Sequence, residues 1–275
     1  LEFTTLKIKD AICDRFRDIY NRRPSVDTKM PDMRIVGFLD ARTFTLYLDT
    51  SGEALFKRGW RMETGDAPLR ENLAAGLLRT SGWKPGMTLF DPMCGSGTIL
   101  AEAAQMLAGI PPGLHRDFAF EKFAGFSKDE WAAIKASVKA NPLPTEPTIF
   151  GSDISGDMVA MTRNNLNKAG IRFEVPLKQI EAQEVKAPSE TPGILLTNPP
   201  YGERIGVRGD STVEADDMAK EFFSAFGTTL KQRFAGWKVF LFTADLGLPK
   251  LLRLKEARKT PVSYTHLRAH ETRGN

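Results

Sequence analysis

The fold is decided by the stretch DPMCGSGT, Asp91 to Thr98. A predicted strand over 88–91 leads into it, and residues 98–107 carry apolar side chains at helical spacing. A glycine-rich turn between a strand and a helix lets a ligand come close to the backbone at the helix N-terminus. The stretch therefore predicts a nucleotide-type binding loop.

Strand and helix patterns alternate around this loop. Such alternation indicates an α/β fold in which helices cover a mostly parallel sheet. A proline-flanked insert at 111–147 interrupts the alternation, and its centre at 128–140 is predicted to be helical. The other predicted elements are a helix at 69–79, a strand at 148–153, a helix at 155–169, strands at 171–175 and 193–197, a helix at 218–234 and a strand at 237–243.

The first sixty residues have the pattern of a small α+β module. Residues 12–20 carry apolar side chains at helical spacing, and Pro24 ends this helix. Residues 33–39 and 43–48 are rich in β-branched and aromatic side chains and are separated by a short turn, so they predict two strands. The segment 59–68 is expected to connect this module to the α/β part.

The composition is that of an ordinary globular protein, with 275 residues, 41% hydrophobic and 26% charged. No run approaches the roughly eighteen apolar residues of a membrane helix, and the first residues lack the layout of a signal peptide. We therefore expect a cytoplasmic protein with no membrane partner. Its two cysteines, Cys13 and Cys94, are too few for a disulfide framework or a four-ligand metal site.

Charge is distributed unevenly along the chain. Residues 1–61 hold 12 Lys and Arg against 9 Asp and Glu, whereas residues 62–261 hold 24 of each. Attraction to the phosphates of a nucleic acid would therefore come mainly from the amino-terminal module. The alternative, an ordinary solvated surface, stays open because the excess is small.

The glycine loop favours one class of nucleotide ligand. Gly95 and Gly97 are followed by Leu100 where a dinucleotide fingerprint has its third glycine, and no Gly-Lys-Ser/Thr follows, so a pyrophosphate ligand is disfavoured. Asp91, at the carboxyl end of its strand, would instead meet a cation such as an amino acid ammonium. This fits the methionine moiety of S-adenosylmethionine, with Cys94 as a small packing residue of the loop.

Two further residues are expected to hold the rest of this cofactor. Asp153, in the segment GSDIS, ends the next predicted strand, where nucleotide folds use a carboxylate to bind a ribose diol. Alternatively, Asp153 only caps the helix that begins near Gly156. Adenine recognition adds a polar side chain after the third strand, and we choose Gln179 over Glu181 and Gln183.

A second motif, Asn198-Pro199-Pro200-Tyr201, follows the buried strand 193–197. Adjacent prolines exclude further ladder pairing, so the backbone has a fixed shape; a merely rigid turn is the alternative reading. An exocyclic purine amine is a poor nucleophile because its lone pair is delocalised, and hydrogen-bond acceptors on its N–H groups make attack feasible. The Asn198 side-chain oxygen and the Pro199 carbonyl can accept, while Tyr201 can stack on a base rotated out of its helix.

These motifs carry a family resemblance. DPMCGSGT, GSDIS and NPPYGER (198–204) resemble the large-subunit ribosomal RNA methyltransferases that modify guanine N2, and KRGWR (57–61) followed by APLRENLAAGLL (67–78) is similar to their interdomain link. KIKDAICDRFRD and RPSVDTKMPDMRI resemble the carboxyl half of a THUMP domain, an RNA-binding module.

The resemblance implies a Rossmann-like class I methyltransferase fold with a partial amino-terminal THUMP domain. It implies the domains 1–56 (THUMP half), 57–68 (linker) and 69–261 (methyltransferase lacking its final strands). Apart from the resemblance, the alternation stops after Pro261, so 262–275 is expected to be a non-native tail. The first residue is Leu rather than Met, so truncation is expected at the amino-terminal end as well as at the carboxyl end. The resemblance also implies that Arg70 and Glu71 approach the methionine end of the cofactor. The implied cofactor-binding residues are Asp91, Pro92, Cys94, Gly95, Gly97, Thr98, Asp153 and Gln179, and the implied catalytic residues are Asn198, Pro199, Pro200 and Tyr201.

The implied activity is methyl transfer from S-adenosylmethionine to guanine N2 in 23S ribosomal RNA, with that RNA as the partner and no obligatory protein partner. Three alternatives remain. A DNA adenine-N6 methyltransferase would use the same acceptors, a protein glutamine methyltransferase would too, and an RNA-binding module with a degenerate cofactor fold would have no activity. A metal site at His266 and His270 is disfavoured because no further ligands accompany them.

Overall fold

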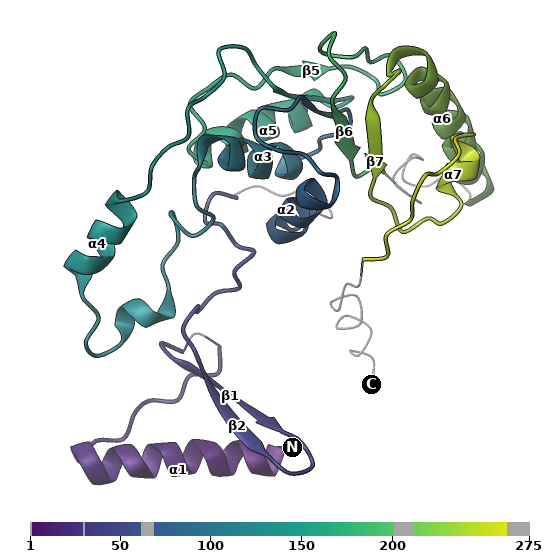
Figure 1. Ribbon diagram of the computed structural model, residues 1–275. Helices are drawn as coiled ribbons and strands as arrows, with labels where there is room; N and C mark the ends of the chain where they lie inside the picture. Colours follow the sequence, from purple (N-terminus) through teal and green to yellow (C-terminus); the bar gives the residue numbers. More distant parts are fainter. Residues whose placement is uncertain (1, 30, 62–68, 201–211, 263–275) are drawn as a thin grey trace. The chain divides into compact units, whose positions relative to one another are not determined.

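The computed structural model describes residues 2–29, 31–61, 69–200 and 212–262, which form two compact units (Figure 1). The described parts of 1–86, 96–146 and 161–174 form the first unit, and those of 87–95, 147–160 and 175–275 form the second. No helix among the described residues combines the length and the hydropathy that a membrane crossing requires.

The second unit is built on a parallel five-stranded sheet in the order β5-β4-β3-β6-β7. Every residue of β3 and β6 is buried, because both faces of a central parallel strand are covered. The predicted α/β fold is thus confirmed. The strands are β3 (Leu89–Asp91), β4 (Ile149–Asp153), β5 (Leu177–Gln179), β6 (Ile194–Thr197) and β7 (Lys238–Leu241).

Two helices, α6 (Thr212–Arg233) and α7 (Leu248–Leu251), supply the core of this unit. Side chains of α6 pack with Phe90 of β3 and Leu195 of β6, and the Phe90 and Phe234 rings stack with centroids 5.9 Å apart. This apolar contact holds the central strands, and therefore the residues at their carboxyl ends, in place.

The first unit contains α2 (Glu71–Thr80), which packs on α3 (Thr98–Ala108). The glycine at each end of α3, Gly97 and Gly109, has a left-handed backbone conformation. Further along the chain are the short helix η1 (Ala119–Lys122), α4 (Lys128–Ala136) and α5 (Gly156–Lys168), of which the residues from 161 onward belong to this unit.

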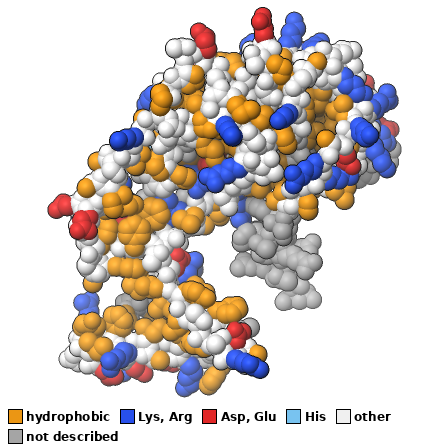
Figure 2. All heavy atoms as spheres, in the orientation of Figure 1, with side chains coloured by type: hydrophobic (Ala, Val, Ile, Leu, Met, Phe, Trp, Pro, Cys, Tyr) orange, Lys and Arg blue, Asp and Glu red, His pale blue; other side chains and the backbone are white. Residues whose placement is uncertain are grey.

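The amino-terminal module has the predicted helix and hairpin: α1 (Glu2–Tyr20), β1 (Arg34–Leu39) and β2 (Phe44–Asp49). The hairpin turn is closed by the Asp40 carboxylate, which accepts hydrogen bonds from the backbone N–H groups of Arg42 and Thr43. Many apolar side chains of the module are exposed, and Figure 2 shows them as an orange surface over α1 and the hairpin.

One predicted strand is wrong. Residues 171–175 form no strand, because the turn after α5 uses them: Gly170 has φ +81° and the Ile171 N–H donates to the Leu166 carbonyl. The third strand is β5 instead. Smaller differences are that α4 ends at Ala136, where the Ser137 hydroxyl donates to the Ile134 carbonyl, and that α6 begins at Thr212. The short elements η1 and α7 were not predicted.

Candidate active site

The second unit brings most of the predicted site residues to one edge of its sheet. In the parallel register Leu89 pairs with Ile194, so Asp91 at the end of β3 lies beside the end of β6, which Asn198 follows. On the other side of β3, Asp153 ends β4 and pairs with Gln179, the last residue of β5. The carboxyl edge of a parallel sheet, where the strand order reverses, is the usual place for a ligand.

Three hydrogen bonds fix the first half of the glycine loop to the end of β4. The Cys94 N–H donates to the Ser152 carbonyl (2.9 Å), the Gly95 N–H donates to Asp153 Oδ2 (2.9 Å), and the Ser152 hydroxyl donates to the Pro92 carbonyl (3.3 Å). Cys94 is buried, as expected of a packing residue. The loop is therefore preorganised rather than shaped by a ligand.

The second half of the loop, 96–98, lies in the first unit, where α5 supports it. The Asn165 amide donates to the Ser96 carbonyl (2.9 Å). Gly97 has φ +78°, and a Cβ placed on it would lie 2.5 Å from Thr162 Cγ2. Only glycine fits here, and Thr98 then begins α3.

Asp91 is an unusual carboxyl group because it is almost fully buried, at 2% exposure. Burial raises the pKa of Asp91 to about 7, the Thr197 hydroxyl and the Met93 N–H lower it, and the charge of Asp153 raises it slightly. A buried carboxylate at the end of a strand is strongly stabilised by a cation, which a bound ligand could supply.

Asp153 has its carboxylate between two backbone donors. Oδ2 accepts from Gly95 and Oδ1 accepts from the Ser155 N–H (3.0 Å). The Ser155 hydroxyl accepts from the Met158 N–H at 3.4 Å, so a residue other than Asp153 caps α5. The Gln179 amide donates to the Ile154 carbonyl (3.1 Å), which holds this side chain over the turn between β4 and α5.

Asn198 stands at the end of β6 with an unusual side chain. It is half-buried, and its Oδ1 is a buried acceptor without a hydrogen-bond partner among the described residues. Pro199 is buried and Pro200 half-buried. Leaving a buried acceptor without a hydrogen bond destabilises the ligand-free protein. A ligand that donates a hydrogen bond to Asn198 Oδ1 would remove this cost. Tyr201, Glu203 and Arg204 lie outside the described residues.

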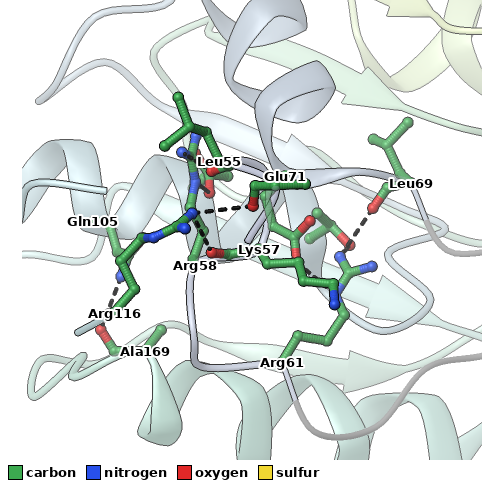
Figure 3. A network of polar contacts seen from close by, with 12 residues as sticks. Leu55, Lys57, Arg58, Arg61, Leu69, Glu71, Gln105, Arg116 and Ala169 are labelled. Atoms are coloured by element: carbon green, nitrogen blue, oxygen red, sulfur yellow. Dashed lines mark hydrogen bonds and ion pairs between the residues drawn. The ribbon is translucent and has the colours of Figure 1, made fainter. Parts of the chain in front are cut away.

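Two side chains were missed by the sequence interpretation. Ile154, directly after Asp153, is 65% exposed on the turn that Gln179 contacts, and the sequence carries no signal that singles it out, because single exposed apolar residues are common. Arg61 is the other: its guanidinium donates to the Thr98 hydroxyl and to the Leu69 carbonyl (2.9 Å) and pairs with Glu71 at 3.2 Å (Figure 3).

Glu71 and Arg70 are therefore engaged in contacts of the first unit. Glu71 is buried in its pair with Arg61, and the Arg70 guanidinium lies 4.4 Å from the centroid of the Phe56 ring. Arg58 pairs with Glu102 at 3.0 Å, and burial raises the pKa of Glu102 although Arg58 opposes it. For Arg61 the direction is opposite: burial lowers the pKa of its guanidinium, and the charge of Glu71 opposes this shift.

Comparison with known proteins identifies the family. Residues 58–273 match the family model described as UPF0020, the RMKL-like methyltransferase domain, and residues 1–49 match the THUMP domain. The chain belongs to the RMKL-like methyltransferase family. Membership confirms the family resemblance and the class I methyltransferase fold that it implied.

The relatives of this RMKL-like chain are longer proteins. A protein of Psychromonas ingrahamii named Ribosomal RNA large subunit methyltransferase K/L is 40% identical over 263 residues, which cover 94% of this chain and 34% of the relative. The chain thus spans about a third of the length of that curated relative.

Solved structures share the fold of this RMKL-like chain. A predicted N6-adenine-specific DNA methylase from Listeria monocytogenes has a TM-score of 0.77 at 29% identity, over 92% of this chain and 64% of that one. SMU.472, assigned as a methyltransferase and complexed with SAH, has a TM-score of 0.73 at 30% identity, over 91% and 64%.

Proposed function

We propose that this chain transfers a methyl group from S-adenosylmethionine to the exocyclic N2 amine of a guanine in 23S ribosomal RNA. One observation supports this most directly: Asn198 Oδ1, a buried acceptor with no hydrogen-bond partner among the described residues, lies at the end of the strand that neighbours the strand of Asp91. The name of the Psychromonas ingrahamii relative favours large-subunit ribosomal RNA as the substrate.

The residues present fit S-adenosylmethionine. The buried Asp91 carboxylate would hold the ammonium of its methionine part, and Gly95, with no atom within 4 Å of its Cβ position, leaves room for it at the backbone. Asp153 and Gln179 would hold the ribose and the adenine, with the exposed Ile154 side chain under the base. Pro92, Cys94 and Thr98 complete the loop. The SAH complex of SMU.472 favours the same cofactor class.

In this proposal the bound cofactor supplies an electrophilic methyl group, and the chain binds and orients the amine. Asn198 Oδ1 and the Pro199 carbonyl would each accept one N–H of the guanine amine, which directs its lone pair toward the methyl group. Pro200 fixes the loop conformation, and Tyr201 would stack on the flipped base. The new N–C bond would form as the bond between the methyl group and sulfur breaks, S-adenosylhomocysteine would be the leaving group, and the amine would lose one proton to solvent.

We assign RNA binding to residues 1–56, connection to 57–68 and methyl transfer to 69–261, and we place the protein in the cytoplasm with its RNA. No stable protein partner is required by this scheme.

A DNA adenine-N6 methyltransferase is the second candidate, which the name of the Listeria monocytogenes structure favours. One experiment distinguishes the RNA and DNA methyltransferase candidates. The protein is incubated with methyl-labelled cofactor and with either protein-free large-subunit RNA or duplex DNA. Label in RNA alone supports the proposal. Label in DNA alone would support the alternative, and cofactor binding in calorimetry without transfer to either would favour a binding module.

A further inference from the structure

Residues 50–61, here termed the connector, follow the part of the chain that matches the THUMP domain, 1–49, and their last four residues already belong to the part that matches the RMKL-like methyltransferase domain, 58–273. The carboxyl end of the connector is anchored on two helices of the first unit. The Arg58 side chain, 11% exposed, makes two hydrogen bonds to Glu102 of α3, and Arg61, 10% exposed, contacts both Glu71 of α2 and Thr98 of α3. Trp60 between them is buried.

The rest of the connector is held by one side chain of the insert, Arg116. Its Nη1 donates to the carbonyls of Ala54 (3.0 Å) and Lys57 (3.3 Å), and its Nη2 donates to those of Ser51 (3.1 Å) and Glu53 (2.6 Å), as Figure 3 shows in part. The two terminal nitrogens of a guanidinium carry four N–H groups in total, so these four carbonyls occupy all of them.

The backbone of the connector also approaches the insert closely. Gly59 has φ +87°, and a Cβ there would lie 2.6 Å from the His115 carbonyl oxygen, while a Cβ on Gly52 would lie 3.3 Å from Ala119. The Phe120 N–H donates to the Thr50 carbonyl at 3.1 Å. Both glycines therefore stand where a larger residue would separate the connector from the insert.

This contact pattern differs from that of a flexible interdomain linker, whose backbone groups bond to water. We propose that the insert 111–147 is a brace that makes the connector rigid, with Arg116 as the positioning residue that holds the RNA-binding module in one orientation relative to α2 and α3 of the same unit. The part of this inference that concerns RNA rests on the proposed function, whereas the rigidity of the connector does not.

The same contacts argue against Arg116 as a direct phosphate ligand. Its terminal donors are already used by backbone carbonyls, so RNA would have to break the brace to bind there. Lysine keeps the charge but has a single nitrogen and lacks the planar fork, so Arg116→Lys cannot hold four carbonyls. If Arg116 is a brace, Arg116→Lys should be defective, whereas if Arg116 only supplies a positive charge to RNA, Arg116→Lys should behave like the parent.

Rigidity is measured without any activity. Spin labels on cysteines introduced at Asp18 of α1 and Asn164 of α5, both exposed, report the distance distribution between the module and the helical part of the first unit. We expect one narrow distribution for the parent and for Lys139→Met, which removes the same charge from an exposed site of the insert. Arg116→Met and Arg116→Lys should both broaden it. An unchanged width in both variants would overturn the brace.

The consequence for RNA is measured by kinetics with the same four proteins. We expect Arg116→Met and Arg116→Lys to raise the KM for RNA about tenfold, with kcat and cofactor affinity within about twofold of the parent, because binding must now order the connector. Normal kinetics in Arg116→Lys with a defect in Arg116→Met would overturn the brace in favour of a charge contact. If the distance distribution of the parent is narrow but the parent does not methylate RNA, the proposed function is rejected while the brace is still supported.

Discussion

The backbone N–H of Gly95 donates a 2.9 Å hydrogen bond to Oδ2 of Asp153, so the glycine loop after β3 is tied to the end of β4 before any ligand binds. The sequence assigns these residues separately, Gly95 to the cofactor-binding loop and Asp153 to the ribose, whereas in the structure they form one hydrogen-bonded element. Changing either should affect both the loop and the ligand.

Asp153 is the first test of this coupling. Asp153→Ala removes the acceptors of two N–H groups, and we expect S-adenosylmethionine affinity to fall at least about tenfold, since hydrogen bonds to a charged acceptor contribute roughly 1.5–3 kcal/mol each. Asp153→Asn keeps one acceptor oxygen, so its affinity for S-adenosylmethionine should fall less. Calorimetry measures both, with Asp157→Asn, an exposed carboxylate on α5, as the control. Unchanged affinity in Asp153→Ala would refute the assignment.

Asn198 should show a trade-off between activity and stability. Asn198→Ala removes a buried acceptor that has no partner among the described residues, so thermal stability should stay equal or rise while kcat falls by about 10² to 10³. Cofactor affinity should be unchanged. Asn164→Ala, at an exposed site on α5, serves as the control. A loss of kcat that only follows a loss of folded protein would argue against a role in amine binding.

Asp91 predicts how cofactor affinity depends on pH. The pKa of Asp91 is raised to about 7 by burial, and only its ionised form can pair with an ammonium, so protons compete with the ligand below that pH. We expect the dissociation constant of S-adenosylmethionine to be roughly eightfold higher at pH 6 than at pH 7.5. Asp91→Asn should bind weakly at both. A flat profile in the parent would contradict pairing through Asp91.

The same carboxyl group predicts the stability of the ligand-free protein. Its folded pKa lies above the ordinary value of 3.8, so the folded state binds the proton more tightly and the free energy of unfolding falls as pH rises from about 4 to about 7. At pH 8 Asp91→Asn should therefore unfold at a higher temperature than the parent without cofactor. Thermal scans at pH 5 and pH 8 check this, and a variant that is less stable at pH 8 would count against it.

Gly97 and Gly76 offer a matched pair of glycine substitutions. Gly97→Ala combines a φ of +78° with a Cβ 2.5 Å from Thr162, and we expect a loss of about 2–3 kcal/mol of stability. Gly76 lies inside α2 with no atom within 4 Å of its Cβ position, so Gly76→Ala should gain up to about 1 kcal/mol. Chemical denaturation of both variants measures the difference; equal effects would show that the loop geometry at Gly97 is not required.

Sequence predicted the elements with long periodic patterns and the residues at the ends of the strands. It placed Asp91, Asp153 and Asn198 correctly at strand ends, because apolar runs bounded by polar residues mark those ends directly. It misplaced the third strand, since alternation over 171–175 looks like a strand while tertiary contacts use it as a turn.

The connector could not have been predicted in this way. Arg58 and Glu102 are 44 residues apart, and Arg116 reaches carbonyl groups up to 65 residues away. Contacts between a side chain and distant backbone oxygens leave no periodic signal, because every residue has a carbonyl group. Gly52 and Gly59 have positive φ in the structure, but a glycine in the sequence does not by itself show that the backbone takes this conformation.

Methyl transfer to the N2 amine of guanine leaves one identifiable product, N2-methylguanosine. Large-subunit RNA treated with the protein and S-adenosylmethionine is digested to nucleosides and analysed by mass spectrometry against synthetic standards. We expect N2-methylguanosine with the parent and about 10² to 10³ times slower formation of it with Asn198→Ala. Methyl groups on adenine N6, on a ring carbon or on ribose, with no N2-methylguanosine, would contradict methyl transfer to guanine N2.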